Sequence, residues 1–195
     1  MLHNNICSIP ANLTKFLAYL KNINFVFPVI GLTETKLSEQ NKSLYDISGY
    51  TSYHLTKDVN ELVRGHGVSV YIRSIYESTI IDRYTICKEY LECIFIDVTF
   101  GINSYIIGVV YRPPNSNVNS FTEEFFNMVN SIKSKFKKPL YLMGDYNLDL
   151  LKYDENKYVC EFLDMFFSYG FIPLINRPTR VTEKNSNNYR SHIHQ

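Results

Sequence analysis

Two short apolar segments of this chain each end in a carboxylate. Phe-Pro-Val-Ile-Gly-Leu-Thr-Glu occupies residues 27–34, and Leu-Tyr-Leu-Met-Gly-Asp occupies residues 140–145. Such runs are typical of buried β-strands, and each strand would bring its terminal acid to the edge of a sheet, where the charge stays in contact with water. If the two strands run in the same direction, Glu34 and Asp145 emerge at one edge. Each acid taken alone could equally open a turn.

The remaining periodicity predicts a mixed α/β domain. Apolar residues recur at helical spacing in residues 12–21, 120–136 and 157–169. Strand-like runs occupy residues 68–72, 92–100 and 104–111, and the last two flank a Gly-Ile-Asn turn that predicts a hairpin. Because strands occur both in hairpins and in alternation with helices, a mixed sheet is favoured over a purely parallel one. With no repeat or linker along the 195 residues, we expect one domain spanning 1–195.

Composition restricts the location of the protein more than its partners. No segment approaches the roughly 18–20 apolar residues that span a bilayer, and the first residues lack the pattern of a secretory signal. We therefore expect a nuclear or cytoplasmic monomer that is neither secreted nor membrane-bound. The net charge of +1 neither supports nor excludes a nucleic-acid partner. The four scattered cysteines predict buried free thiols rather than a zinc site.

Further polar residues follow the predicted strands. Asn147 lies two positions after Asp145, so an acceptor and an amide donor stand side by side and could orient a water while binding a phosphate oxygen. Tyr111 ends a strand and is followed by two prolines and Asn115. Proline fixes that turn, which would leave Tyr111 and Asn115 facing the edge of the sheet. A tyrosine in this position is also a common packing residue.

In chain order, these motifs resemble those of the endonuclease/exonuclease/phosphatase superfamily, whose fold is that of DNase I. The motifs are Asn5, Thr-Glu-Thr-Lys-Leu at 33–37, Gly-Val-Ser-Val-Tyr at 67–71, Tyr-Arg-Pro-Pro-Asn at 111–115, Gly-Asp-Tyr-Asn at 144–147 and Arg-Pro-Thr-Arg at 177–180. Within the superfamily they look like the endonuclease domain of non-LTR (LINE-type) retrotransposons. The resemblance covers essentially the whole chain.

The resemblance implies a four-layer sandwich, with two mixed β-sheets face to face and helices outside, and an Mg²⁺-dependent (or Mn²⁺-dependent) enzyme that nicks DNA. Glu34 would hold the metal with Asn5 close by. Asp145 would orient or deprotonate the attacking water, Asn147 would help to place it, and Tyr111 would contact the scissile phosphate. Asn115 and Arg180 would bind substrate. In a complete element, a reverse transcriptase domain would be a partner.

The sequence departs from the family pattern in three places. Lys36 stands where the family usually has tryptophan, and Cys7 stands where it often has arginine. The Ile-Asp-His-Ile and Ser-Asp-His motifs that the family carries beyond Arg180 do not occur, and His192 and His194 do not replace them. Codons compatible with residues 189–195 give Ile-Asp-His-Ile-Phe-Thr when read one base later, which suggests a frameshift. We therefore expect an incomplete domain that lacks its last strands, with nicking activity impaired by the loss of the C-terminal Asp/His motif.

Two alternatives stay open from the sequence. The chain could be a catalytically inactive remnant of the same fold that binds nucleic acid or a protein. It could also hydrolyse a phosphoinositide or sphingolipid, although no segment resembles a membrane-insertion loop.

Overall fold

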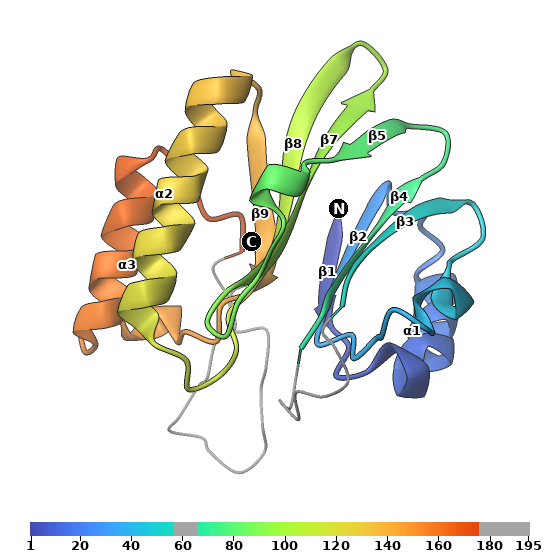
Figure 1. The fold of residues 1–195 in the computed structure, drawn as a ribbon, viewed down its shortest axis with the longest axis horizontal. Coiled ribbons are helices and arrows are strands. Elements are labelled where there is room, and N and C mark those ends of the chain that lie inside the picture. Colours follow the sequence, from blue (N-terminus) through green and yellow to red (C-terminus); the bar gives the residue numbers. More distant parts are fainter. Residues whose placement is uncertain (57–65, 176–195) are drawn as a thin grey trace.

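Two β-sheets lie face to face in the computed structural model of the chain, which describes residues 1–56 and 66–175 (Figure 1). The strands are β1 (Leu2–Asn5), β2 (Val29–Thr33), β3 (Tyr50–Leu55), β4 (Val68–Arg73), β5 (Glu77–Ile80), β6 (Ile86–Cys87), β7 (Glu92–Phe100), β8 (Asn103–Tyr111) and β9 (Leu140–Asp145). Sheet A has the order β1-β2-β4-β3, and sheet B has the order β5-β7-β8-β9 with β6 paired to β7. The pairs β1–β2 and β8–β9 are parallel and the others antiparallel, so both sheets are mixed.

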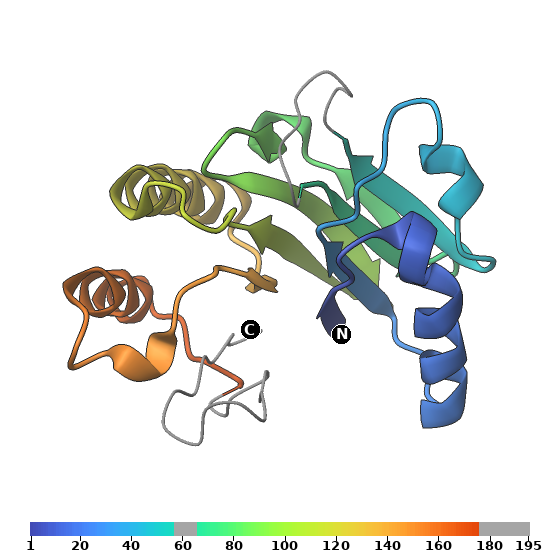
Figure 2. The same ribbon diagram turned by 90° about the horizontal axis from the view of Figure 1, so that it is seen from below.

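Helices cover the outer face of each sheet. The helix α1 (Ile9–Ile23) lies outside sheet A, and α2 (Val118–Phe136) and α3 (Lys157–Ser168) lie outside sheet B (Figure 2). Each helix begins at a polar cap: Ser8, Asn117 and Asn156 accept hydrogen bonds from the first-turn amides of α1, α2 and α3. None of the described helices has the length and apolar character needed to cross a membrane.

The side chains of β8 point alternately to the two faces of sheet B and so contact both neighbouring layers. Ile106 and Val110 face the helices, whereas Ile107, Val109 and Tyr111 face sheet A, as the period of two in a strand requires. Between the sheets, these side chains meet an apolar layer from sheet A that includes Val29, Val68, Val70 and Ile72. Gly31 allows the two sheets to approach closely, since a Cβ there would lie 2.9 Å from the Val109 side chain.

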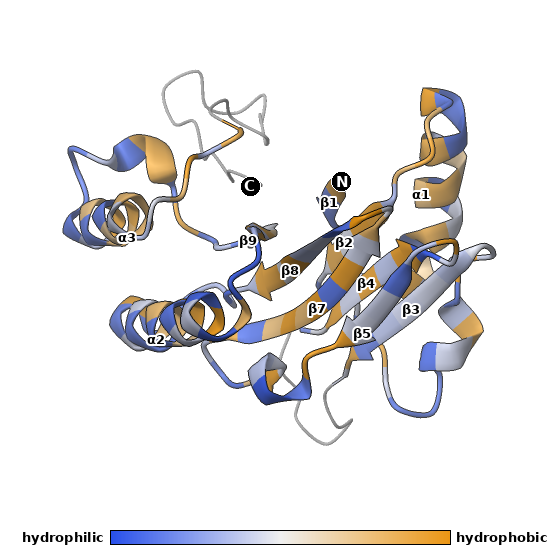
Figure 3. Ribbon diagram, turned by 90° about the horizontal axis from the view of Figure 1, so that it is seen from above, coloured by the Kyte–Doolittle hydropathy of each residue, from blue (hydrophilic) through white to orange (hydrophobic). Residues whose placement is uncertain are grey.

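The outer layer of sheet B is an aromatic cluster. Phe121, Phe125 and Phe126 of α2 meet Phe162 and Phe166 of α3 with ring centroids 5.2–6.4 Å apart. In Figure 3, the central strands and the helix faces turned toward them have the apolar colour, in agreement with this cluster.

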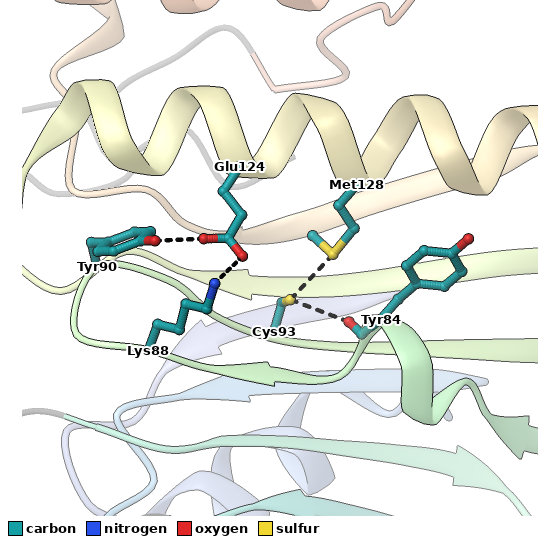
Figure 4. Close-up of polar contacts among 6 residues, drawn as sticks. All are labelled: Tyr84, Lys88, Tyr90, Cys93, Glu124 and Met128. Carbon is teal, nitrogen blue, oxygen red and sulfur yellow. Dashed lines mark hydrogen bonds and ion pairs between the residues drawn. The ribbon is translucent and has the colours of Figure 1, made fainter.

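Polar contacts fix the orientation of α2 on the sheet. Glu124 accepts hydrogen bonds from Lys88 and Tyr90 beside β7 (Figure 4). Deeper in the same interface, the Cys93 thiol contacts Met128 and the Tyr84 carbonyl. Cys93 is buried as expected for a free thiol, but Cys7 and Cys87 are exposed, so the expectation of burial is wrong for those two.

The predicted elements agree with the observed ones to within a few residues, including the hairpin of β7 and β8. The strands β3, β5 and β6 were not predicted, because each has polar residues on both faces or is only two residues long. The predicted substrate residue Arg180 and the proposed frameshift at 189–195 lie outside the described residues.

Candidate active site

The site lies where the carboxyl ends of two parallel strand pairs meet. In sheet A, Asn5 ends β1 opposite Thr33, and Glu34 directly follows β2. In sheet B, Tyr111 and Asp145 are opposite one another at the ends of β8 and β9. The strands β1 and β2 contact β9 across the sandwich, and the four ends lie at the lower edge in Figure 1. Residues far apart in sequence therefore share one edge of the molecule.

Asn5 connects the two carboxylates. Its Nδ2 donates to Glu34 Oε1 at 2.8 Å and to Asp145 Oδ2 at 2.9 Å. The two acceptor oxygens can be no farther apart than the sum of these distances. Asn5 Oδ1 accepts from the Cys7 amide at 3.1 Å, which fixes the orientation of the side-chain amide. Glu34 and Asp145 therefore converge at one edge of the sandwich, as expected if their strands run in the same direction.

Tyr111 contacts this pair as a hydrogen-bond donor. Its hydroxyl donates to Glu34 Oε1 at 3.2 Å, and its ring is fully buried between the sheets. Burial raises the pKa of the Tyr111 phenol, and the negative charges of Glu34 and Asp145 raise it further. The phenol therefore keeps its proton at neutral and moderately alkaline pH, and can act only as a hydrogen-bond donor toward an anion.

Asp145 and Asn147 form a compact turn after β9. The Asn147 amide donates to Asp145 Oδ1 at 3.0 Å, so both oxygens of this buried carboxylate are fixed by N–H donors. The side chain of Asn147 points its Nδ2 at the Arg112 carbonyl, at 2.8 Å. The sequence predicted that Asn147 Nδ2 would bind a phosphate oxygen, but this nitrogen already donates to a backbone carbonyl. The Oδ1 atom of Asn147 is therefore the one that can orient a water.

The backbone around the site is unusual. Cys7, Glu34, Lys36, Asn115 and Asn147 all have φ between 48° and 63°, in the left-handed region. Elsewhere in the described chain, the non-glycine residues with positive φ are the helix caps Asn24 and Lys137. Left-handed non-glycine residues cost about 1–2 kcal/mol each, and such conformations concentrate at functional sites.

Arg112 was not predicted from the sequence. Only 4% of its surface is exposed, and its guanidinium donates to the Tyr146 and Asn147 carbonyls at 2.6 Å each and to the Ser116 carbonyl at 3.0 Å. The available signal was its place within the Tyr-Arg-Pro-Pro-Asn motif at 111–115.

Glu92 was also missed. It is 1% exposed, faces Tyr111 across the β7–β8 ladder, and accepts a hydrogen bond from the Gly67 amide at 2.6 Å. Gly67 in turn accepts from the Thr35 amide at 3.2 Å, next to Glu34. Glu92 thus connects sheet B to the segment that carries Glu34. Its position at the start of an apolar strand was the available signal.

The predicted substrate residue Asn115 lies on the same edge but outside the hydrogen-bonded group. It is exposed on the turn after Pro113 and Pro114, with φ 63°. Its neighbour Ser116 is held by Arg112, with Nη1 to Oγ at 3.1 Å. The position is compatible with a contact to substrate beyond the reacting phosphate.

The residues present fit a divalent cation. Glu34 is half-buried, and among the described residues no basic side chain pairs with it. The described chain has no cluster of three or more His, Cys, Asp or Glu side chains that could enclose a metal. The converging carboxylates of Glu34 and Asp145 suit Mg²⁺, which binds oxygen ligands, keeps several waters and takes few protein ligands.

Comparison with known proteins identifies the fold. No family model matches the chain, and no curated protein sequence matches it. Among solved structures, the endonuclease domain of TRAS1, a telomere-specific non-LTR retrotransposon, aligns with a TM-score of 0.68 and 13% identity over 99% of this chain and 82% of that one. The AP endonuclease LMAP from Leishmania major aligns with a TM-score of 0.59 and 15% identity over 85% of this chain and 65% of that one.

A third structure, the 3′ phosphatase NExo from Neisseria bound to a product DNA hairpin, aligns with a TM-score of 0.58 and 14% identity over 88% of this chain and 71% of that one. At these identities the likeness establishes the fold. The chain has the DNase-I-like α/β sandwich that these enzymes share, with two mixed sheets and helices outside, and the fold class expected from the sequence is confirmed.

Proposed function

We propose that the chain is a divalent-metal-dependent phosphodiesterase that nicks DNA. The observation that carries the proposal is the double hydrogen bond of Asn5 Nδ2 to Glu34 and Asp145. If this edge of the sandwich were purely structural, two acids 111 positions apart in the sequence would not be expected to share one amide donor. The fold is shared with a retrotransposon endonuclease domain and with a 3′ phosphatase bound to a DNA hairpin, which supports DNA as the substrate.

We assign each residue of the site the role that the resemblance implies and that its contacts fit. Glu34, with Asn5 beside it, would hold Mg²⁺ or Mn²⁺, which when bound neutralises charge on the phosphate and orients it. Asp145, fixed by two N–H donors, accepts the proton of the attacking water. Asn147 Oδ1 orients that water. The Tyr111 hydroxyl donates to a phosphate oxygen as negative charge develops in the transition state.

Substrate contacts outside this group come from the adjoining turns. The exposed amide of Asn115 would bind a neighbouring phosphate of the same strand. Arg180 remains a prediction from the resemblance. A reverse transcriptase domain as partner is part of the same proposal and rests on the resemblance to retrotransposon endonucleases.

Nicking of supercoiled plasmid by the full chain tests the proposal. We expect activity with Mg²⁺ or Mn²⁺ and none with EDTA. Glu34→Gln and Asp145→Asn should each lower the rate by about 100-fold or more, because each removes a group that acts in the transition state. Glu77→Gln is the matched control, since Glu77 is an exposed carboxylate on β5 and its loss should leave the rate unchanged.

Two results would overturn the proposal. One is a folded parent that does not nick with either metal; DNA binding without cleavage would then favour the inactive, nucleic-acid-binding alternative. The other is a Glu34→Gln variant as active as Glu77→Gln, which would place the metal elsewhere. Phosphate release from phosphoinositide vesicles in place of plasmid nicking would identify the lipid-hydrolysing alternative.

A further inference from the structure

Arg112 is a buried cation whose described partners are all uncharged. Its guanidinium contacts the carbonyl oxygens of Tyr146, Asn147 and Ser116, the Ser116 hydroxyl, and more distantly the Pro113 carbonyl at 3.4 Å. Burial lowers the pKa of this arginine, and the charge of Asp145 opposes that shift. Arginine nevertheless stays protonated in proteins. A buried charge is tolerated only when its hydrogen bonds are satisfied, so the surrounding carbonyls must stay in place.

Two different edges of the Arg112 guanidinium bind two different loops. Nε and Nη2 donate side by side to the peptides after Asp145, each at 2.6 Å. Nη1 donates to the turn after β8, where Ser116 also caps Pro113 through its hydroxyl at 2.7 Å. The backbone of Arg112 adds two more contacts, because its amide donates to the Asp145 carbonyl at 3.0 Å and its carbonyl accepts from Asn147 Nδ2 at 2.8 Å.

These contacts hold the conformations that the site requires. Asn147 and Asn115 both adopt left-handed φ, one in each loop that the guanidinium contacts. Without the guanidinium, the carbonyls of Tyr146 and Asn147 would lose their partner, and the left-handed turn would relax toward ordinary backbone conformations. Asp145 itself would remain at the end of β9, but Asn147 Oδ1 would no longer point in a fixed direction.

We propose that Arg112 is the positioning residue of the candidate active site: its planar guanidinium fixes the 145–147 turn and the 113–116 turn relative to each other, and so aligns the attacking water with the phosphate. The proposal rests on the proposed nuclease function. Lysine cannot replace it, because one ammonium cannot donate in parallel to two carbonyls and also reach a third.

Kinetics of Arg112→Lys and Arg112→Ala test this role. We expect kcat for plasmid nicking to fall by about 100-fold, as small misplacements of reacting groups do, while KM and the Mg²⁺ concentration for half-maximal rate change less than threefold. Guanidinium ion, added far below its denaturing range, should restore part of the rate to Arg112→Ala and none to Asp145→Asn. Arg83→Lys is the matched control, because Arg83 is exposed on the 3-10 turn Asp82–Tyr84.

A second measurement decides the proposal even if the parent does not nick. Hydrogen exchange of the Asn147 backbone and side-chain amides should be slow in the parent and faster by at least tenfold in Arg112→Lys, while the β7 and β8 amides stay protected. Equal protection at Asn147 in both proteins would overturn the positioning role. So would a folded Arg112→Lys variant with the kcat of the parent. A failure of nicking with the exchange result intact would count against the proposed function alone.

Discussion

Sheet A and sheet B hold their site residues in different ways. Tyr111 and Asp145 of sheet B lie on adjacent strands, β8 inside the sheet and β9 at its edge. The phenylalanine layer of α2 and α3 backs these strands, and Arg112 binds the turn that follows Asp145. Asn5 and Glu34 of sheet A lie on an edge strand and in a left-handed turn, and a short series of hydrogen bonds through Gly67 and Glu92 connects them to sheet B.

The outer layers show the same contrast. Beneath α1, sheet A buries a smaller apolar cluster that includes Phe16, Ile30 and Tyr71. On the same sheet, His54 contacts the Ser69 hydroxyl at 2.8 Å, and its imidazole lies 3.5 Å from the exposed carboxylate of Asp46. Beneath α2 and α3, sheet B buries aromatic rings. Sheet B therefore holds Tyr111 and Asp145 against a large aromatic layer, whereas a few polar contacts hold Glu34 of sheet A. Under the proposed function, the groups that act in the transition state lie on the sheet with the larger aromatic layer.

The largest expected effect on the free energy of unfolding comes from removing a buried phenylalanine ring of α2, and we compare it with the removal of a ring of α1. Phe125→Ala removes a fully buried ring in contact with the aromatic cluster and Tyr146, and should lower the free energy of unfolding by about 3–5 kcal/mol. Phe16→Ala in α1 removes a ring that is 8% exposed and should cost less. Urea denaturation measures both, with the exposed Phe167→Ala as control. A larger loss for Phe16 would contradict the comparison.

The connection between the sheets depends on Glu92. Glu92→Ala leaves the buried Gly67 amide without its charged acceptor and should cost about 2 kcal/mol in unfolding free energy. Glu92→Gln keeps an acceptor oxygen of the same shape and should cost less than half as much. Equal losses in the two variants, measured by urea denaturation, would show that the hydrogen bond to Gly67 is not what the side chain contributes.

The smallest effect is a pH dependence located in sheet A. Burial lowers the pKa of His54, although the hydrogen bond and charge of Asp46 oppose the shift. Because the folded protein takes up this proton less readily than the unfolded chain, the contribution is fully present above the unfolded pKa and is lost as pH falls through it toward the lower folded pKa. Stability should therefore decline below about pH 6.5, by at most about 1.4 kcal/mol per pH unit.

Urea denaturation at a series of pH values measures this decline. His54→Gln removes the titrating group and should flatten the curve between about pH 7 and pH 5 relative to the parent. An unchanged slope in the variant would assign the acid sensitivity to other groups.

Local patterns were enough to predict which residues reach the edge of the sandwich. Glu34 and Asp145 follow apolar runs, and Tyr111 follows a hairpin strand, so strand geometry alone carries all three to strand ends. The strands β3 and β5 escaped prediction because their alternation is weak, and pairing with β4 and β7 stabilises them instead. Arg112 and Glu92 escaped because charged residues next to strands are usually exposed.

The sequence by itself determined the order of helices and strands, the apolar faces and the residues that end the strands, because these depend on spacings of two to four residues along the chain. Only the tertiary structure decided that Asn5 meets both acids, that Arg112 faces carbonyls and that Glu92 reaches Gly67. Those contacts join residues 25 to 140 positions apart, and their partners are fixed by how the two sheets pack, which no local spacing encodes.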